Sequence, residues 1–290
     1  MAVQRLNCLE LLNKMNVAYD AGELKVVADT VDATTKTGLN GVLAGDGANV
    51  GAVETLPVSM GGTGAADTDT ARLNLGAASN PNLLDNWDFR NPVNQRGETE
   101  YTKAGYTIDR WMLSASSGLQ LTITDDGISF TADTYGKSLQ QYIENQYEAG
   151  TVLTASLIVG EGVTARISLL QGSSVLGRSN YVSAGLVSVT VTTLDNTDDI
   201  RIFINVSEAG TVILKRAKLE LGSVSTIEND PPADHATELL GCQRYFQIYS
   251  SASARPSSGV DCRPVMRIAA PTQGTAEIDG TTYYYNSADL

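Results

Sequence analysis

Short stretches in which apolar and polar residues alternate run through the middle of this chain and constrain its fold more than any other feature. Successive side chains of a strand point to opposite faces, so a period of two predicts strands with one buried face. Gly, Asp and Asn turn signals separate the stretches, which predicts an all-β sandwich. The alternating positions are Leu119, Leu121 and Ile123; Leu153, Ala155, Leu157 and Val159; Val163, Ala165, Ile167 and Leu169; residues 186–191; residues 200–206; and Ile213, Ala217, Leu219 and Leu221.

The segment just before the alternation, residues 82–111, holds both tryptophans of the chain, Trp87 and Trp111, with Phe89 between them. Aromatic side chains bury roughly 150–250 Å² each, so this segment is expected to begin the core. Packing is the first interpretation of both tryptophans. The alternative that one of them, Trp111, stacks on a ligand stays open.

Residues 21–80 contain no aromatic residue and are dominated by Gly, Ala, Thr, Asn and Val. Such a segment cannot bury enough apolar area to offset its ordering entropy. It is therefore either disordered or completed by other chains, and apolar clusters between its Gly turns favour the second. Residues 65–76 predict a short helix capped by Asp67, filled by Ala71, Leu73 and Leu75, and ended by Gly76.

The first twenty residues predict a short amphipathic helix, with Leu6, Leu9, Leu12 and Met15 on one stripe. A helix this short is marginal by itself. We expect it to need a partner, either another copy of itself or an attachment site.

Residues 223–290 begin with a turn-rich linker in which Asp230 and two prolines end the preceding strand. Asp234 is the expected N-cap of a helix through Arg244, with Leu239 and Leu240 facing inward. Strand-like stretches follow at residues 244–251, 264–270 and 281–286. A β segment this small is expected to pack on the sandwich or on copies of itself.

The net charge of −13 disfavours nucleic acid as a partner and leaves neutral or cationic partners and polar glycans open. No apolar run approaches 18 residues, so no membrane insertion is expected. No signal peptide is recognisable, so export by the usual route is not expected.

Cys8, Cys242 and Cys262 lack metal-ligand spacing and are expected to be free or buried thiols, although a Cys242–Cys262 disulfide stays open.

Residues with catalytic or metal-binding chemistry are sparse. His235 is the only histidine, and no nucleophile pairs with it in sequence, so no catalytic residue is assigned. Asp125 with Asp126, and Asp198 with Asp199, could bind Ca²⁺ from loops, but solvated turns are the simpler interpretation. No cofactor and no metal site are predicted.

Tyrosine is frequent, with 12 residues against 4 phenylalanines. Its ring gives rigid, amphipathic contact area that suits sugar or protein surfaces. The candidate ligand-binding residues are Tyr283, Tyr284 and Tyr285, with Arg263 and Arg267 as donors and Trp111 as noted above. Packing of the three tyrosines between subunits is the alternative.

Two parts of the sequence resemble known families. LPVSMGGTGAADTDTARLNLG, at residues 56–76, resembles the GGTG…A…R.NLG joint of bacteriophage tail fibres, and LNGVLAGDGANVGAV, at residues 39–53, resembles stretches of the same proteins. NLLDNWDF at residues 82–89 and KRAKLELGSVST at residues 215–226 look like the first and last strands of carbohydrate-binding jelly rolls. Residues 94–97 and 106–111 match the versions of this jelly roll found in phage tail proteins, and residues 219–246 resemble a junction that precedes the distal tip in prophage tail proteins.

The resemblance implies a mainly β protein in three parts. These are an N-terminal helix and thin trimeric shaft at residues 1–80, a jelly-roll sandwich at 81–222, and a linker helix with a small β tip at 223–290. It implies a homotrimeric tail fibre of a phage or phage-like particle that binds a host-surface glycan. The N-terminus would attach to baseplate or tail proteins of the virion, which is assembled in the bacterial cytoplasm and acts outside.

The chain is therefore expected not to be an enzyme. Two alternatives remain: a capsule-degrading tailspike, although no solenoid repeat is visible, and a purely structural tail connector.

Overall fold

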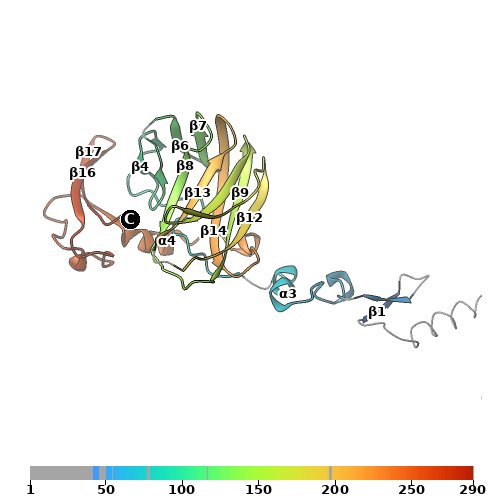
Figure 1. The fold of residues 1–290 in the computed structure, drawn as a ribbon. Helices are drawn as coiled ribbons and strands as arrows, with labels where there is room; N and C mark the ends of the chain where they lie inside the picture. Colours follow the sequence, from blue (N-terminus) through green and yellow to red (C-terminus); the bar gives the residue numbers. More distant parts are fainter. Residues whose placement is uncertain are drawn as a thin grey trace, which may run out of the picture. The chain divides into compact units, whose positions relative to one another are not determined.

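The computed structural model of the chain describes residues 42–45, 50–53, 55–76, 79–115, 117–195 and 198–289 (Figure 1). The chain divides into two compact units, Met1–Ala77 and Ala78–Leu290. The amphipathic helix predicted over residues 1–20 and the Gly-rich stretch that continues to residue 41 lie outside the described residues.

The first unit contains a two-stranded hairpin, a 3-10 turn and a short helix. Strand β1 (Val42–Gly45) pairs antiparallel with β2 (Val50–Val53), and η1 (Val58–Met60) and α3 (Thr68–Asn74) follow. The backbone N–H of Thr70 donates to Asp67 Oδ1 at 2.9 Å, and Gly76 ends the helix at a φ of +61°. The predicted helix, its Asp67 cap and its Gly76 stop are therefore confirmed.

The GGTG segment of this unit is a compact turn that only glycine can form. A Cβ at Gly62 would lie 2.0 Å from the carbonyl oxygen of Leu56. The N–H of Gly64 donates to the same oxygen at 2.8 Å, and Asn74 Nδ2 donates to the carbonyl of Thr63 at 2.8 Å. The hydrogen bond from Asn74 therefore joins the turn to the C-terminal end of α3.

The second unit contains two six-stranded antiparallel sheets that face each other (Figure 1). One sheet has the order β12-β9-β14-β7-β6-β3 and the other β11-β10-β13-β8-β5-β4. The strand bounds are β3 (Glu100–Tyr101), β4 (Gly105–Tyr106), β5 (Met112–Leu113), β6 (Leu119–Thr124), β7 (Gly127–Ala132), β8 (Ser138–Ile143), β9 (Val152–Gly162), β10 (Ala165–Gln171), β11 (Ser174–Arg178), β12 (Gly185–Thr192), β13 (Ile200–Val206) and β14 (Gly210–Leu221).

The pairing of these strands is nested. Strand β10 pairs with β11, β9 with β12, β8 with β13, and β7 with β14, so each outer pair encloses the one inside it. A long antiparallel ribbon that folds over into two sheets in this way is a jelly roll. The predicted mainly β fold and its central jelly-roll sandwich are therefore confirmed.

The core lies between the two sheets and contains the aromatic segment that precedes them. Trp111 and Phe89 are fully buried, and their rings meet edge to face with centroids 5.0 Å apart. Trp111 Nε1 donates to the carbonyl of Asn86 at 2.9 Å, so its one polar atom is satisfied. Trp87 is also buried, and the segment begins the core as expected.

One strand departs from its predicted face. The register of β14 shifts between Val212 and Leu214 and again between Leu214 and Arg216. Because a bulge inserts a residue, Val212 and Leu214 enter the core, whereas Ile213, predicted inward, does not. Leu221, also predicted inward, is 50% exposed at the strand end.

A buried cation fastens the linker to β14. Lys218 is fully buried, and its Nζ donates to Asp230 Oδ1 at 2.6 Å and to Thr226 Oγ1 at 2.9 Å. Thr226 Oγ1 in turn donates to Glu220 Oε2 at 2.6 Å. Thr226 and Asp230 lie on either side of η2 (Ile227–Asn229), so these hydrogen bonds hold both ends of this part of the linker against β14.

Helix α4 (His235–Gln243) confirms the predicted linker helix, and the side chain of Asp234 caps it. Its contact face differs from the prediction, because Leu240 is 57% exposed. The helix instead presents Glu238, whose Oε2 accepts from the N–H of Asn86 at 2.6 Å and whose Oε1 accepts from Trp87 Nε1 at 3.1 Å.

A three-stranded sheet ends the chain, in the order β15-β17-β16. Its strands are β15 (Phe246–Tyr249), β16 (Thr272–Ile278) and β17 (Thr281–Ser287), with η3 (Gly259–Asp261) between β15 and β16. The stretch 264–270, predicted as a strand, is irregular, because Met266 and Ala269 form backbone hydrogen bonds with the Gly259 turn instead of a neighbouring strand. Cys242 and Cys262 are buried free thiols, as expected.

Candidate functional site

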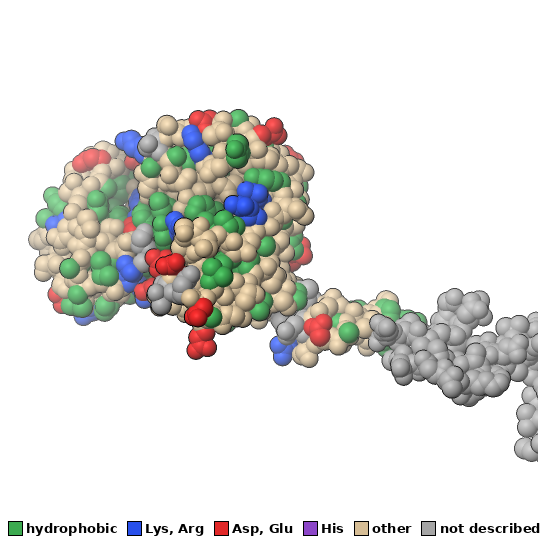
Figure 2. Space-filling model, viewed as in Figure 1, with side chains coloured by type: hydrophobic (Ala, Val, Ile, Leu, Met, Phe, Trp, Pro, Cys, Tyr) green, Lys and Arg blue, Asp and Glu red, His purple; other side chains and the backbone are tan. Residues whose placement is uncertain are grey.

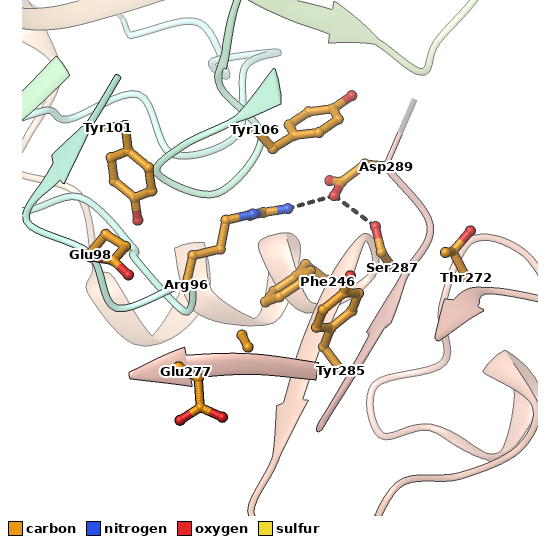
Figure 3. Close-up of a pocket in the computed structure, with 11 residues that line it drawn as sticks. Arg96, Glu98, Tyr101, Tyr106, Phe246, Thr272, Glu277, Tyr285, Ser287 and Asp289 are labelled. Atoms are coloured by element: carbon orange, nitrogen blue, oxygen red, sulfur yellow. Dashed lines mark hydrogen bonds and ion pairs between the residues drawn. The ribbon is translucent and has the colours of Figure 1, made fainter. Parts of the chain in front are cut away.

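A pocket of about 580 Å³ opens where the sandwich loops around residues 96–106 face the C-terminal sheet (Figure 3). Four aromatic rings, one guanidinium and several carboxylates line it. Gly97 sits against Ile278 of β16, where a Cβ would lie 2.5 Å from Ile278 Cγ2, so the two walls are in close contact beside the pocket. The lining residues are Arg96, Glu98, Tyr101, Tyr106, Phe246, Thr272, Ala276, Glu277, Tyr285, Ser287 and Asp289.

Arg96 lies at the centre of the pocket and joins its two walls. Nη1 is 2.6 Å from Asp109 Oδ1 in the sandwich, and Nη2 is 2.6 Å from Asp289 Oδ2 after β17. The guanidinium carbon is 4.0 Å from the ring centroid of Phe246 and 5.4 Å from that of Tyr106. Ion pairing and cation–π contact together fix the orientation of this side chain.

The two carboxylates share this single cation. Burial raises the pKa of Asp109 to about 6, against the opposing effects of Arg96 and of two hydrogen bonds from Gln95. Burial also raises the pKa of Asp289, again opposed by Arg96 and by Ser287, whose Oγ donates to Asp289 Oδ2 at 2.9 Å. Because one guanidinium cannot neutralise two buried carboxylates, a raised pKa is the expected outcome.

Aromatic rings form the walls on both sides of Arg96. The ring of Tyr285 lies 5.2 Å from that of Phe246 and covers Gly274, where a Cβ would meet Tyr285 Cζ at 2.4 Å. Burial is the main cause that raises the pKa of Tyr106 to about 12 and the pKa of Tyr101 above its ordinary value. Both phenols therefore stay protonated at neutral pH and can donate hydrogen bonds.

Tyr285 is the predicted ligand-binding residue that lines this pocket. Tyr283 shares its face of β17 by strand alternation, and Tyr284 lies on the opposite face, with the guanidinium carbon of Arg255 5.7 Å from its ring. The structure thus places the three tyrosines on two surfaces.

The other three predicted residues do not line the pocket. Trp111 is in the sandwich core. Arg267 Nη1 donates to the carbonyl of Ala288 at 3.0 Å, and Arg263 Nη1 donates to the carbonyl of Cys262 at 2.7 Å. Both guanidinium groups therefore support the backbone of the C-terminal region.

The sequence did not predict a ligand-binding role for Arg96, Tyr101, Tyr106 or Phe246, and it assigned Tyr101 and Tyr106 to the aromatic segment that begins the core. The available signal was the match of residues 94–97 and 106–111 to phage tail proteins, because these two segments supply Arg96, Tyr106 and Asp109. Their meeting with Phe246 and Tyr285 depends on how the C-terminal sheet docks, which no local pattern specifies.

Within the residues that the structure describes, no three His, Cys, Asp or Glu side chains gather in a way that could hold a metal ion. Asp126 is instead 3.0 Å from Lys215 Nζ. On the visible face of the molecule, acidic side chains are scattered (Figure 2). In the same described part of the chain, no helix has the length and apolarity needed to cross a bilayer.

No family model matches this chain, and no curated protein matches it. Solved structures match weakly. They include TmCBM61 in complex with β-1,4-galactotriose, at 15% identity over 49% of this chain and 99% of that chain, with a TM-score of 0.31. Xylanase10C from Cellvibrio japonicus matches at 16% identity over 43% of this chain, with a TM-score of 0.30, and the match spans only 28% of that chain.

The enzymatically active domain of tailspike protein 4 from bacteriophage CBA120 matches at 11% identity. That match covers 49% of this chain and 21% of the tailspike chain, with a TM-score of 0.30. Similarity at this level does not bear on ligand or activity, so the jelly-roll assignment rests on the nested strand pairing described above.

Proposed function

We propose that this chain is a tail-fibre protein of a phage or phage-like particle and that it binds a neutral host-surface glycan in the pocket around Arg96. The observation that carries the proposal is the composition of that pocket. Four aromatic rings stand beside carboxylates, the hydroxyls of Thr272 and Ser287, and a guanidinium in about 580 Å³. Sugars present apolar C–H faces that stack on rings and hydroxyls that need directional polar partners.

The charge of the pocket supports a neutral ligand. Arg96 is already paired with Asp109 and Asp289, so its charge is compensated before any ligand arrives. Glu98 and Glu277 add two further carboxylates to the lining. An acidic sugar would therefore meet a negative potential, whereas hydroxyl groups can donate to these oxygens.

The first unit supports the trimer and attachment parts of the proposal. Val58, Met60 and Leu75 are 47%, 54% and 54% exposed within that unit, although they belong to the segment that resembles the tail-fibre joint. Apolar side chains left open in a thin segment are expected to pack against sister subunits. Three sites on one fibre would raise avidity by about 10²–10⁴ without new contacts.

Binding of neutral oligosaccharides to the full chain and to Tyr285→Ala tests the ligand part. We expect the substitution to weaken binding by about tenfold or more, because a stacking ring and its hydroxyl are removed. Tyr135→Ala is the matched control, since Tyr135 is 73% exposed and does not line the pocket. Equal affinity of Tyr285→Ala and the unsubstituted chain would reject this site.

The mass of the full chain in solution tests the trimer. Light scattering after size exclusion is expected to give three times the 30.7 kDa chain mass. A single monomer peak at micromolar concentration contradicts the fibre assignment but leaves the glycan pocket untouched.

Glycan cleavage is the second candidate function. Glu98 of the sandwich and Glu277 of β16 both line the pocket, and glycoside hydrolysis requires two carboxylates that flank the scissile bond. A tailspike enzyme would release reducing ends from a bound polysaccharide. Both Glu98→Gln and Glu277→Gln would abolish that release. If the chain is instead a structural connector that binds no receptor, particles that carry it should adsorb to host cells equally well after deletion of residues 244–290.

A further inference from the structure

The second sheet of the sandwich has an outer face with an unusual charge. Its four jelly-roll strands, β8, β10, β11 and β13, contain Arg166, Arg178 and Arg201 and no Asp or Glu. The isoleucines of β13 at positions 200, 202 and 204 are buried in the core, so Arg201 and Phe203 point to the opposite, outer face. In a chain of net charge −13, this face is a local exception.

Strand pairing fixes the arrangement of this face, which we call the arginine face. Ser168 of β10 pairs with Arg178 on one side and with Phe203 on the other. Arg166 pairs with Asn205, and Arg201 lies four residues from Asn205 along β13. At 3.3–3.4 Å per residue, the two arginine positions are roughly 13 Å apart along the strands, with Phe203 between them.

Neutral groups hold the arginines. Arg201 Nη1 donates to the Tyr142 hydroxyl at 3.1 Å, Nη2 donates to the carbonyl of Gly172 at 2.6 Å, and its guanidinium carbon is 5.3 Å from the ring centroid of Phe203. The guanidinium carbon of Arg166 is 4.5 Å from the ring centroid of Tyr181.

Neither Arg166 nor Arg201 forms an ion pair with a carboxylate among the described residues. Their positive charge is therefore available to a ligand.

Two buried polar atoms on the arginine face also lack partners. Ser168 is 2% exposed, and its hydroxyl has no hydrogen-bond partner among the described residues. The same holds for Nε of Arg166. Since buried polar groups are nearly always hydrogen-bonded, two neighbouring exceptions on one face indicate groups that a ligand would satisfy.

We propose that the arginine face is a second binding site and that it takes an acidic glycan. Arg166 and Arg201 would hold two carboxylate or phosphate groups of the chain, and Phe203 would contact the sugar ring between them. Guanidinium groups pair strongly with both kinds of anion. Carboxylates flank the site at its ends. Glu144 follows β8 and pairs with Arg244 at 3.1 Å, and Asp198 and Asp199 precede β13 beside Gly172.

This site is separate from the pocket around Arg96 in position and in charge. The pocket favours neutral sugars, whereas the arginine face favours anionic ones. A chain that carries both could bind two components of one host surface, and the failure of either site leaves the other intact.

Titration of the full chain with three probes tests the ligand class. The probes are a galacturonic acid decamer, its fully methyl-esterified counterpart and a phosphorylated oligomannose. We expect the decamer to bind about tenfold or more tightly than its ester, and this advantage to shrink as salt is raised. The phosphorylated probe shows which anion the face prefers. Equal binding of the acid and its ester, with no binding of the phosphorylated probe, overturns the proposal.

Substitutions locate the binding. Arg166→Gln with Arg201→Gln is expected to weaken acid binding by about 100-fold, since two charged hydrogen-bonding groups are lost. Lys215→Gln, on the other sheet, is the matched control and should bind as the unsubstituted chain does. If the double variant does not fold, Ser168→Ala, which removes one buried hydroxyl, should still lower the affinity severalfold.

Tyr285→Ala should leave acid binding unchanged, which separates this site from the pocket. Unaltered acid binding by the folded double variant, or loss of acid binding in Tyr285→Ala, would assign the acidic glycan elsewhere.

Discussion

Protonation of Asp109 should make the folded chain more stable as the pH falls. Its pKa is about 6 in the folded chain against an ordinary value of 3.8, so the folded state binds the proton more tightly. Its contribution to stability is therefore greatest below pH 3.8 and falls as the pH rises through 6. The two pKa values differ by about 2.2, which corresponds to a maximum stabilisation of about 3 kcal/mol at about 1.36 kcal/mol for a difference of one. Integration between about pH 7.5 and 5.0 gives a gain of about 1.4 kcal/mol on acidification.

Urea unfolding of the unsubstituted chain and of Asp109→Asn at about pH 7.5, 6.0 and 5.0 measures this contribution. The amide introduced by the substitution cannot titrate, so the gain of about 1.4 kcal/mol between the ends of the range should disappear from the variant. Asp289 and Glu238, whose pKa values are also raised by burial, and Glu144, whose pKa is lowered, are present in both proteins. If both proteins show the same change in stability with pH, Asp109 does not retain its proton and the account of the shared guanidinium is wrong.

Two further predictions concern packing. Lys218→Met should lower the free energy of unfolding by about 3–5 kcal/mol, because Glu220 and Asp230 lose their buried cation. Lys215→Met, at a half-buried position of the same strand, should cost less than about 1 kcal/mol in the same denaturation experiment. Gly274→Ala should displace the Tyr285 ring and so reduce the binding of neutral glycan. The melting temperature of the sandwich should stay almost unchanged. Retention of full affinity would show that the position of the ring is unimportant.

Local patterns were sufficient for the strands with one buried face. Alternation located β6, β9, β10, β12 and β13, because each has a regular inward row. In β14 it placed Ala217 and Leu219 correctly but not Ile213, because two register shifts change which residues face inward. It gave no signal for β16, whose sequence TQGTAEI has too few apolar residues to show a period. Leu240 was misplaced because the contact of α4 is made by a carboxylate, Glu238, which polarity rules assign to solvent.

The candidate site was less predictable than the fold. Tyr285 could be proposed from tyrosine chemistry alone. Arg96, however, acts through residues 13 and 193 positions away in sequence, Asp109 and Asp289. Such a cluster follows from the docking of two sheets. The arginine face had a fainter signal, since its three arginines are separated in sequence and only strand register brings them to one surface.

The nested ribbon also determines how the sandwich would carry tension. The chain enters and leaves it at adjacent points: the N–H of Leu83 donates to the carbonyl of Leu219, and the N–H of Asn80 donates to Thr226 Oγ1. A pull applied between residue 79 and residue 230 would load these few bonds and the Lys218 cluster in shear. The twelve strands lie outside the loaded path, so such a pull need not deform the pocket around Arg96 or the arginine face.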